Sequence, residues 1–365
     1  MLETFTDQLA QAIALTDGQV AEAVMRLVDE QVSAEAKAGF LAALAKKGET
    51  TEEMAAFARE LGRHAIRPPL DAETRARVIL DVCGTGGDRQ QTFNISTTVA
   101  LIVVAAGVTV AKHGNRAITS QAGSADVLEA LGVRIDLTPA EAARSLREHR
   151  FAFFFAPQYH PAFKHIGPAR KLCAQRGQRT IFNFLGPVLN PARPSAQLIG
   201  ISRPELCEPV ARVLQTLGVR RGLVVSGSVA SGVARPQSKA EGGSASDAIY
   251  LDEFSTLGDN TVAEFSEDRA IAVSTMRLDQ FALQPATLAD LRGGDCRANA
   301  EIIRRILSGV ERGPKREVVL LNAAAALGVA GKTSALREGW DLAAAMIDSG
   351  KAQAKLMELA ENVPA

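Results

Sequence analysis

Two glycine-containing segments carry the residues best suited to chemistry. The first runs Asp-Val-Cys-Gly-Thr-Gly-Gly-Asp over residues 81–88, and Asn94-Ile-Ser-Thr then opens an apolar stretch. Glycines let backbone N–H groups approach an anion closely, and a helix start offers free amides at the positive end of the helix dipole. The spacing is neither the Walker nor the dinucleotide pattern. It predicts a phosphate site, although the same residues would suit a purely structural turn with Asn94 or Ser96 as helix cap.

The second segment reads Lys112-His-Gly-Asn-Arg and follows a predicted strand. Residues 119–126, Thr-Ser-Gln-Ala-Gly-Ser-Ala-Asp, then lead into a helix. Open α/β sheets bind ligands beyond the carboxyl ends of their strands, and two such ends in succession form a crevice. Taken singly, Lys112 and Arg116 would be ordinary surface charges and His113 an ordinary loop histidine, so the prediction depends on their combination.

Short β-branched runs separated by helical stretches are expected to position these residues. We predict strands at 78–82, 108–111, 151–155, 198–201, 223–225, 261–265 and 270–273, and helices at 298–307, 317–327 and 336–348. Strands that alternate with helices indicate a mostly parallel sheet wrapped by helices. Residues 228–248 are rich in Ser, Gly and Ala, and we expect a mobile loop there.

The first sixty-odd residues are expected to form a separate helical unit. Apolar residues recur at helical spacing, and Thr51-Glu-Glu-Met is typical of a helix start. The Arg67-Pro-Pro-Leu segment ends this unit, because prolines withhold backbone donors. We therefore expect a helical domain at 1–68, joined by helices from about 165–190, and an α/β domain at 69–365.

Composition limits the class of partner. The 41 basic residues balance the 41 acidic residues, without a long basic run, which argues against nucleic acid. The four cysteines are dispersed, as expected for a reducing cytosol. The acidic N-terminus does not resemble a signal peptide, and the apolar run at 99–110 is too short to cross a bilayer. We expect a cytoplasmic protein that does not bind membranes.

The motifs together resemble those of the anthranilate phosphoribosyltransferases. The matching motifs lie at residues 84–88, 92–97, 112–116, 123–126 and 128–132. Further matches are His160-Pro-Ala, Arg170-Lys and residues 179–191. It covers nearly the whole chain. It implies a small helical domain and a large α/β domain like that of nucleoside phosphorylases, usually paired as a homodimer through the helical domains. The implied activity is transfer of phosphoribosyl from phosphoribosyl pyrophosphate to the amine of anthranilate, with release of pyrophosphate, in tryptophan biosynthesis.

The resemblance also implies roles for individual residues, with no general base among them. The phosphoribosyl pyrophosphate site would comprise Gly84, Thr85, Gly87, Asp88, Asn94, Ser96, Thr97, Lys112 and Ser124. Anthranilate would meet Gly84, Asn115 and Arg170, with His113 and His160 near its path into the site. Magnesium would bind Asp252, Glu253 and Ser96. Mg²⁺ favours carboxylates together with phosphate oxygens and retained waters, which suits an adjacent acidic pair.

Two features depart from the family pattern, and two other functions remain open. Ser226 stands where the family commonly has histidine, and the connection from there to Asp252 is longer than usual. One alternative is a nucleoside phosphorylase of the same broad fold, although Arg170 favours an aromatic acid over a pyrimidine. The other is a non-catalytic relative that binds nucleic acid, for which a basic groove and degraded phosphate loops would be expected.

Overall fold

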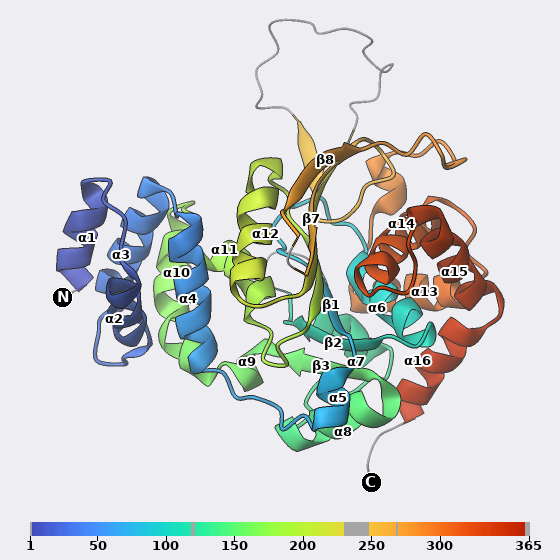
Figure 1. Cartoon of the computed structure of the whole chain (residues 1–365), viewed down its shortest axis with the longest axis horizontal. Helices are drawn as coiled ribbons and strands as arrows, with labels where there is room; N and C mark the ends of the chain where they lie inside the picture. The colour runs from blue at the N-terminus through green and yellow to red at the C-terminus, as the bar shows by residue number, and fades with distance from the viewer. Residues whose placement is uncertain (1, 118–120, 230–247, 268, 362–365) are drawn as a thin grey trace, which may run out of the picture.

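Four helices form one end of the molecule in the computed structural model, which describes residues 2–117, 121–229, 248–267 and 269–361. They are α1 (Leu2–Ala10), α2 (Asp17–Val28), α3 (Ala34–Lys47) and α4 (Thr51–Arg63). The helix start predicted at Thr51 is present: Thr50 and Glu53 form a reciprocal capping box at the beginning of α4. Figure 1 shows this end standing apart from the sheet.

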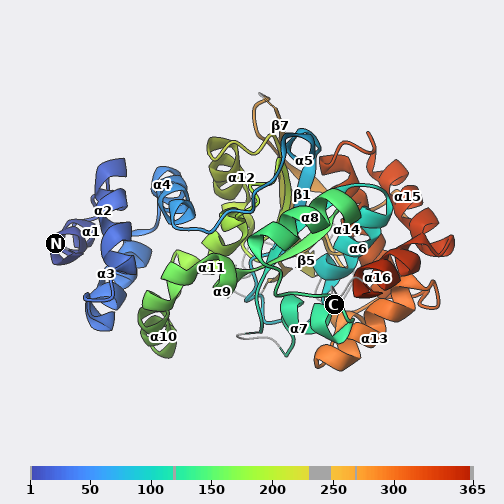
Figure 2. The same cartoon turned by 90° about the horizontal axis from the view of Figure 1, so that it is seen from below.

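A later part of the chain returns to these helices. The helices α10 (Gly167–Gln175), α11 (Phe182–Leu185) and η2 (Gly186–Leu189) share a hydrophobic core with α1–α4, to which Ile166, Cys173 and Ile181 contribute. The buried Lys37 on α3 donates to the carbonyl oxygen of His165 at 2.9 Å. Figures 1 and 2 both place α10 beside the N-terminal helices.

The larger part of the molecule is built on one mixed sheet, in the order β3-β2-β1-β4-β5-β7-β8, with β6 pairing to β5. The strands β1 to β5 run parallel, whereas β5–β6, β5–β7 and β7–β8 are antiparallel pairs. Their bounds are β1 (Ile79–Gly84), β2 (Thr109–Gly114), β3 (Phe151–Phe155), β4 (Ala196–Gly200), β5 (Arg221–Val229), β6 (Ile249–Leu251), β7 (Asn260–Ser266) and β8 (Ala272–Met276).

Helices cover both faces of this sheet, and the alternation of side chains along each strand shows how. Leu223 and Val225 on β5 join the large core that contains α6 and α14. Val224 between them joins the core that contains α12. The central parallel strands are therefore buried on both faces, which explains why they read as continuous apolar runs.

The remaining helices complete the layers. On the side of the larger core lie α6 (Ile95–Ala105), α7 (Ser124–Ala130), η4 (Leu288–Leu291), α13 (Cys296–Leu307), α14 (Pro314–Val329), α15 (Leu336–Asp348) and α16 (Lys351–Glu361). The others are α5 (Ala72–Ala76), α8 (Pro139–His149), α9 (Ala156–Tyr159), η1 (Pro161–His165), η3 (Pro204–Leu206) and α12 (Cys207–Thr216). Among the described residues, no helix is long and apolar enough to cross a membrane.

Three local predictions need correction. Lys112, His113 and Gly114 do not follow β2 but form its last residues. The predicted loop at 228–248 begins too early, because Ser228 and Val229 pair with β6; residues 230–247 lie outside the described structure. The last strand begins at Ala272 rather than at 270, and the three-residue β6 was not predicted because it is too short to show a pattern.

Candidate active site

The acidic pair Asp252-Glu253 crosses the carboxyl ends of the central strands. A Cβ atom at Gly84, the end of β1, would lie 2.5 Å from Asp252 Oδ2. A Cβ at Gly200, the end of β4, would lie only 1.6 Å from the Asp252 carbonyl oxygen. Glycine is therefore required at both strand ends, because any side chain there would displace the acidic segment. The Gly86 N–H donates to Asp252 Oδ2 at 2.6 Å, which ties the glycine-rich turn to the pair.

Ser96 connects the acidic pair to Lys112. The backbone N–H of Ser96, in the first turn of α6, donates to Glu253 Oε1 at 3.2 Å. The Lys112 Nζ donates to Ser96 Oγ at 3.3 Å and to the Val82 carbonyl oxygen at 2.7 Å. Lys112 is buried, in contrast to an ordinary surface lysine. Hydrogen bonds thus connect α6 both to β2 and to the acidic pair.

These carboxyl groups are in an environment that resists negative charge. Burial, followed by the negative charges of Asp88 and Glu253, raises the pKa of Asp252 well above its usual value. Burial raises the pKa of Glu253 to about 7, although Lys112 opposes this. Among the described residues, the buried Oδ2 of Asp88 has no hydrogen-bond partner. A divalent cation would relieve this accumulation of carboxylates.

The acidic pair does not by itself form a complete metal site. Within the described ranges, no group of three or more His, Cys, Asp or Glu side chains is arranged to hold a metal ion. Mg²⁺ usually takes only one or two protein carboxylates and completes its coordination with water and substrate phosphates. Asp252 and Glu253 therefore fit Mg²⁺ bound together with a phosphate ligand.

The end of β2 brings a second group of predicted residues together. The Asn115 carbonyl oxygen accepts hydrogen bonds from Ala125 N at 3.2 Å and from Ser124 Oγ at 3.4 Å. A Cβ on Gly114 would lie 2.2 Å from Ser124 Oγ, so only glycine allows α7 to approach β2 this closely. Asn115 and Ser124 are therefore neighbours, as a shared substrate site requires.

His113 and His160 form a buried, neutral pair. Their ring centroids are 5.2 Å apart, and His113 Nδ1 lies 3.2 Å from the Gly186 carbonyl oxygen. Burial lowers the pKa of His113 to about 3 and that of His160 to about 4. Both rings are consequently uncharged near neutral pH, and they suit an aromatic ligand better than an isolated anion.

Arg170, on α10, is a half-buried cation. Burial lowers its pKa, and its guanidinium lies 5.3 Å from the centroid of the Phe182 ring. No ion pair of Arg170 occurs in the part of the chain that the structure describes. A guanidinium in this state is suited to a carboxylate ligand, which it can hold with two parallel hydrogen bonds.

A pocket of about 500 Å³ lies between the helical part and the sheet. Of the predicted ligand residues, only Thr85 and Gly87 line it. The basic residues Lys46, Arg89, Arg179 and Arg203 also line it, and no role was predicted for them. Arg89 could have been suspected because it directly follows the glycine-rich turn, and Arg179 because it opens the motif at 179–191, but nothing local marks Arg203. A basic pocket beside that turn suits an anionic substrate.

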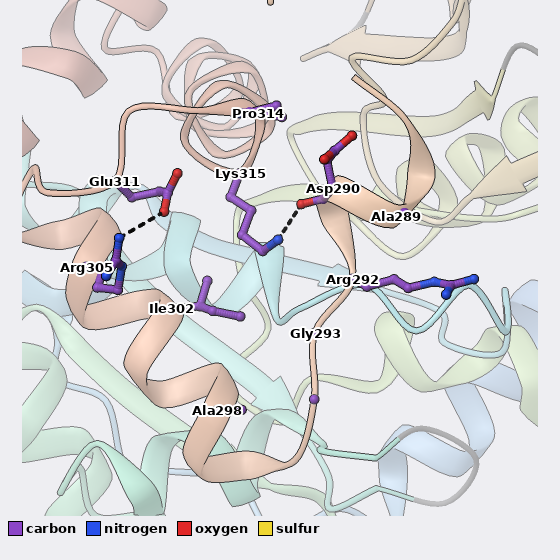
Figure 3. A pocket seen from close by; sticks show the side chains of 11 residues that line it. Ala289, Asp290, Arg292, Gly293, Ala298, Ile302, Arg305, Glu311, Pro314 and Lys315 are labelled. Atoms are coloured by element: carbon purple, nitrogen blue, oxygen red, sulfur yellow. Dashed lines mark hydrogen bonds and ion pairs between the residues drawn. The ribbon is translucent and has the colours of Figure 1, made fainter. Parts of the chain in front are cut away.

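A second pocket, of about 540 Å³, lies elsewhere on the molecule (Figure 3). It is lined by η4, α13 and α14 and the segments that lead into both helices, among them Arg292, Arg305 and Lys315. None of the residues predicted for chemistry lines it. We therefore take the pocket beside the glycine-rich turn as the active-site cleft.

Two family models match the chain. Residues 4–65 match the helical bundle domain of a glycosyl transferase family. Residues 76–240 and 246–353 match the α/β domain of the same family. The chain is similar to the anthranilate phosphoribosyltransferase of Petrotoga mobilis, with 42% identity covering 99% of this chain and 96% of the relative. The enzyme of the same name from Symbiobacterium thermophilum is 44% identical over 97% of this chain and 95% of its own.

Solved structures give the same result. The crystal structure of anthranilate phosphoribosyltransferase from Thermus thermophilus matches with a TM-score of 0.82 and 38% identity, covering 98% of each chain. The Saccharomyces cerevisiae enzyme, solved in complex with phosphoribosyl pyrophosphate and Mg, has the same fold, with a TM-score of 0.82 at 24% identity over 99% of this chain and 98% of its own. These matches favour the transferase over the nucleoside phosphorylase and nucleic-acid-binding alternatives. The chain belongs to the anthranilate phosphoribosyltransferase family and is an enzyme of the glycosyl transferase class.

Proposed function

We propose that the cleft binds phosphoribosyl pyrophosphate across the carboxyl ends of the strands and anthranilate toward the helical part. The observation that carries this proposal is the contact of Lys112 with Ser96 and of Ser96 with Glu253, which combines a buried cation, a helix start and a carboxylate. Such a combination serves a phosphate with an associated metal ion.

For phosphoribosyl pyrophosphate, we assign the residues that surround the two strand ends. They are Gly84, Thr85, Gly87, Asp88, Asn94, Ser96, Thr97, Lys112 and Ser124. The backbone amides of the turn and Lys112 would neutralise charge on the leaving pyrophosphate. Buried, preorganised donors are effective in this role because they need no rearrangement as the charge develops.

Mg²⁺ would be held by Asp252, Glu253 and the hydroxyl of Ser96. Burial raises both carboxyl pKa values, and among the described residues the buried Oδ2 of Asp88 has no hydrogen-bond partner. Both observations support this assignment, because a bound cation would stabilise the carboxylate forms. The yeast relative was solved with both phosphoribosyl pyrophosphate and Mg. When bound, the ion would supply positive charge to the pyrophosphate group.

For anthranilate, we assign Gly84, Asn115, Arg170, His113 and His160. Arg170 would pair with the carboxylate, and the neutral histidines would border the aromatic ring. The amine of anthranilate is already a nucleophile, so its nitrogen forms the bond to C1 of the ribose as the bond from C1 to the pyrophosphate oxygen breaks, and the amine then releases one proton to solvent water. Catalysis would then depend on positioning and on charge neutralisation, without a general base from the protein.

We also propose that the chain divides into domains at 1–68 and 69–365, with the helices of about 165–190 joined to the first. The shared core of α1–α4 with α10 and α11 supports this division. We expect a homodimer formed through the helical domains, which sedimentation equilibrium would test. The free cysteines Cys83, Cys173, Cys207 and Cys296 are consistent with a reducing, cytoplasmic compartment.

The central experiment mixes purified protein with anthranilate, phosphoribosyl pyrophosphate and magnesium and follows the loss of anthranilate fluorescence. Loss that requires all three components supports the assignment. Persistence of the fluorescence with demonstrably folded protein would refute it. Replacing magnesium with EDTA tests the metal separately.

A further inference from the structure

Asn94 occupies the capping position of α6 but does not cap it. Asparagine is favoured at this position because its side-chain oxygen ordinarily accepts from an N–H of the first turn. Here the side chain makes no such bond. Its Oδ1 accepts instead from Asn299 Nδ2 at 2.9 Å, and its Nδ2 donates to the Ala122 carbonyl oxygen at 3.3 Å. The amide is thus directed away from its own helix.

Asn299, on α13, holds the amide of Asn94 in one orientation. The side chain of Asn299 is only 2% exposed, and its Oδ1 accepts from Gly294 N at 2.8 Å. Because the side-chain oxygen of Asn299 accepts from Gly294 N, the NH₂ group of Asn299 is the part of the amide that faces Asn94. The order Gly294, Asn299, Asn94, Ala122 forms a chain of hydrogen bonds in which every donor and acceptor has a fixed direction.

The segment before α13 also holds the backbone that leads to α6. Gly293 N donates to the Gln91 carbonyl oxygen at 2.9 Å, and Phe93 N donates to the Leu291 carbonyl oxygen at 3.1 Å. A Cβ on Gly293 would lie 2.8 Å from Phe93 Cα, so glycine is needed for this close packing. Figure 3 shows the segment through Gly293 running directly into α13. Asn299 is consequently fixed relative to Asn94.

This arrangement leaves donors of Thr97 free. Thr97 is the third residue of α6, whose N–H a capping asparagine would take. Within the described residues its N–H has no hydrogen-bond acceptor, and its buried hydroxyl has no partner either. Thr97 is 1% exposed, and an unpaired buried polar group is costly unless a ligand satisfies it.

We propose that Asn299 is a positioning residue: it prevents Asn94 from capping α6, so that the Thr97 donors remain available to phosphate oxygens. This role rests on the proposed binding of phosphoribosyl pyrophosphate at the start of α6. Asn299 itself touches no substrate. Its effect is to remove an internal competitor, the side chain of Asn94, from the donors that the phosphate needs.

The test compares Asn299→Ala in two backgrounds by calorimetry with phosphoribosyl pyrophosphate and magnesium. In the otherwise unchanged enzyme, the Kd should rise about five-fold, which is the equivalent of one helix cap. The KM for anthranilate should stay the same. In an Asn94→Ala background, Asn299→Ala should have no further effect on the Kd, because no side chain remains to compete.

Two further variants separate positioning from stability. Asn299→Asp keeps the acceptor for Gly294 but, as a carboxylate, has no donor for Asn94, so the Kd should again rise. Ile303→Val, in the buried face of α13, should lower the melting temperature without changing the Kd. An unchanged Kd in Asn299→Ala, or equal losses in both backgrounds, would overturn the inference. Wild-type enzyme that does not bind phosphoribosyl pyrophosphate would overturn the proposed function as well.

Discussion

Replacing Glu253 with glutamine should stabilise the substrate-free enzyme while it impairs catalysis. Glu253 is 9% exposed, and burial raises the pKa of its carboxyl group from 4.5 to about 7. Glutamine keeps the size of the side chain and an oxygen that can accept from Ser96 N, as Glu253 Oε1 does at 3.2 Å. The substitution therefore removes little besides the charge.

The size of the effect follows from the pKa. The folded enzyme binds the Glu253 proton more tightly than the unfolded chain, so its free energy of unfolding falls as the pH rises from 4.5 through about 7. Well above that range, the buried charge costs about 3 kcal/mol of stability. Glu253→Gln lacks this cost. The free energy of unfolding of Glu253→Gln should therefore exceed that of the wild type by about 3 kcal/mol at about pH 8.5 and by less than about 1 kcal/mol at about pH 5.

Urea unfolding of both proteins with EDTA, at the two pH values, measures this difference. Glu264→Gln, on the exposed side of β7, is the matched control and should change stability by less than about 0.5 kcal/mol. Magnesium with phosphoribosyl pyrophosphate should stabilise the wild type far more than Glu253→Gln. The reasoning would be refuted if Glu253→Gln were less stable than the wild type at the higher pH.

Three further predictions concern the proposed substrate and metal sites. Arg170→Ala should raise the KM for anthranilate roughly 10- to 150-fold, because it loses an interaction worth about 1.5–3 kcal/mol, whereas Arg176→Ala, at an exposed position, should leave this KM unchanged. Calorimetry that shows an equal loss of affinity for both substrates would argue against a carboxylate partner of Arg170. Gly200→Ala should displace Asp252 and lower both the melting temperature and the activity. Gly62→Ala is the control, because a Cβ at Gly62 would have no atom within 4 Å. Unchanged kinetics of Gly200→Ala would contradict the proposed role of the Asp252 position. The double variant Asp252→Asn, Glu253→Gln should have a strongly reduced rate, which excess magnesium should partly restore. If the rate of the double variant depends on magnesium concentration as that of the wild type does, the two carboxylates are not magnesium ligands.

The sequence predicted the parallel strands well because they are buried on both faces. The strand at 151–155 was placed correctly, and β1, β2, β4 and β5 were found with shorter or slightly shifted bounds. The antiparallel strands β6 and β8 were predicted less well. Residues 272–275 of β8 are exposed, so the apolar pattern there is weak, and β6 is only three residues long.

The close approaches within the site could not be predicted from the sequence. Nothing near Gly200 in the sequence indicates that Asp252 crosses it, because the two are 52 positions apart and meet only through the pairing of β4 with β5 and of β5 with β6. Asn299 gave no signal either: it lies in an amphipathic helix, and its partner Asn94 is 205 positions away. Side chains whose role depends on a distant partner have no local pattern.

Several groups of the proposed site destabilise the substrate-free enzyme. Burial opposes the ionisation of Asp252 and Glu253. Among the described residues, the half-buried Arg170 has no ion-pair partner and the donors of Thr97 are unsatisfied. Each feature lowers the stability of the free enzyme, and each would be relieved by a ligand of the opposite kind: a cation, a carboxylate and a phosphate. Because groups that are already in place need no reorganisation when charge develops on the leaving pyrophosphate, this loss of stability is the expected counterpart of a preorganised site. It follows that substrates should stabilise the enzyme more than their contact area alone implies, and that variants which neutralise these groups should gain stability as they lose activity.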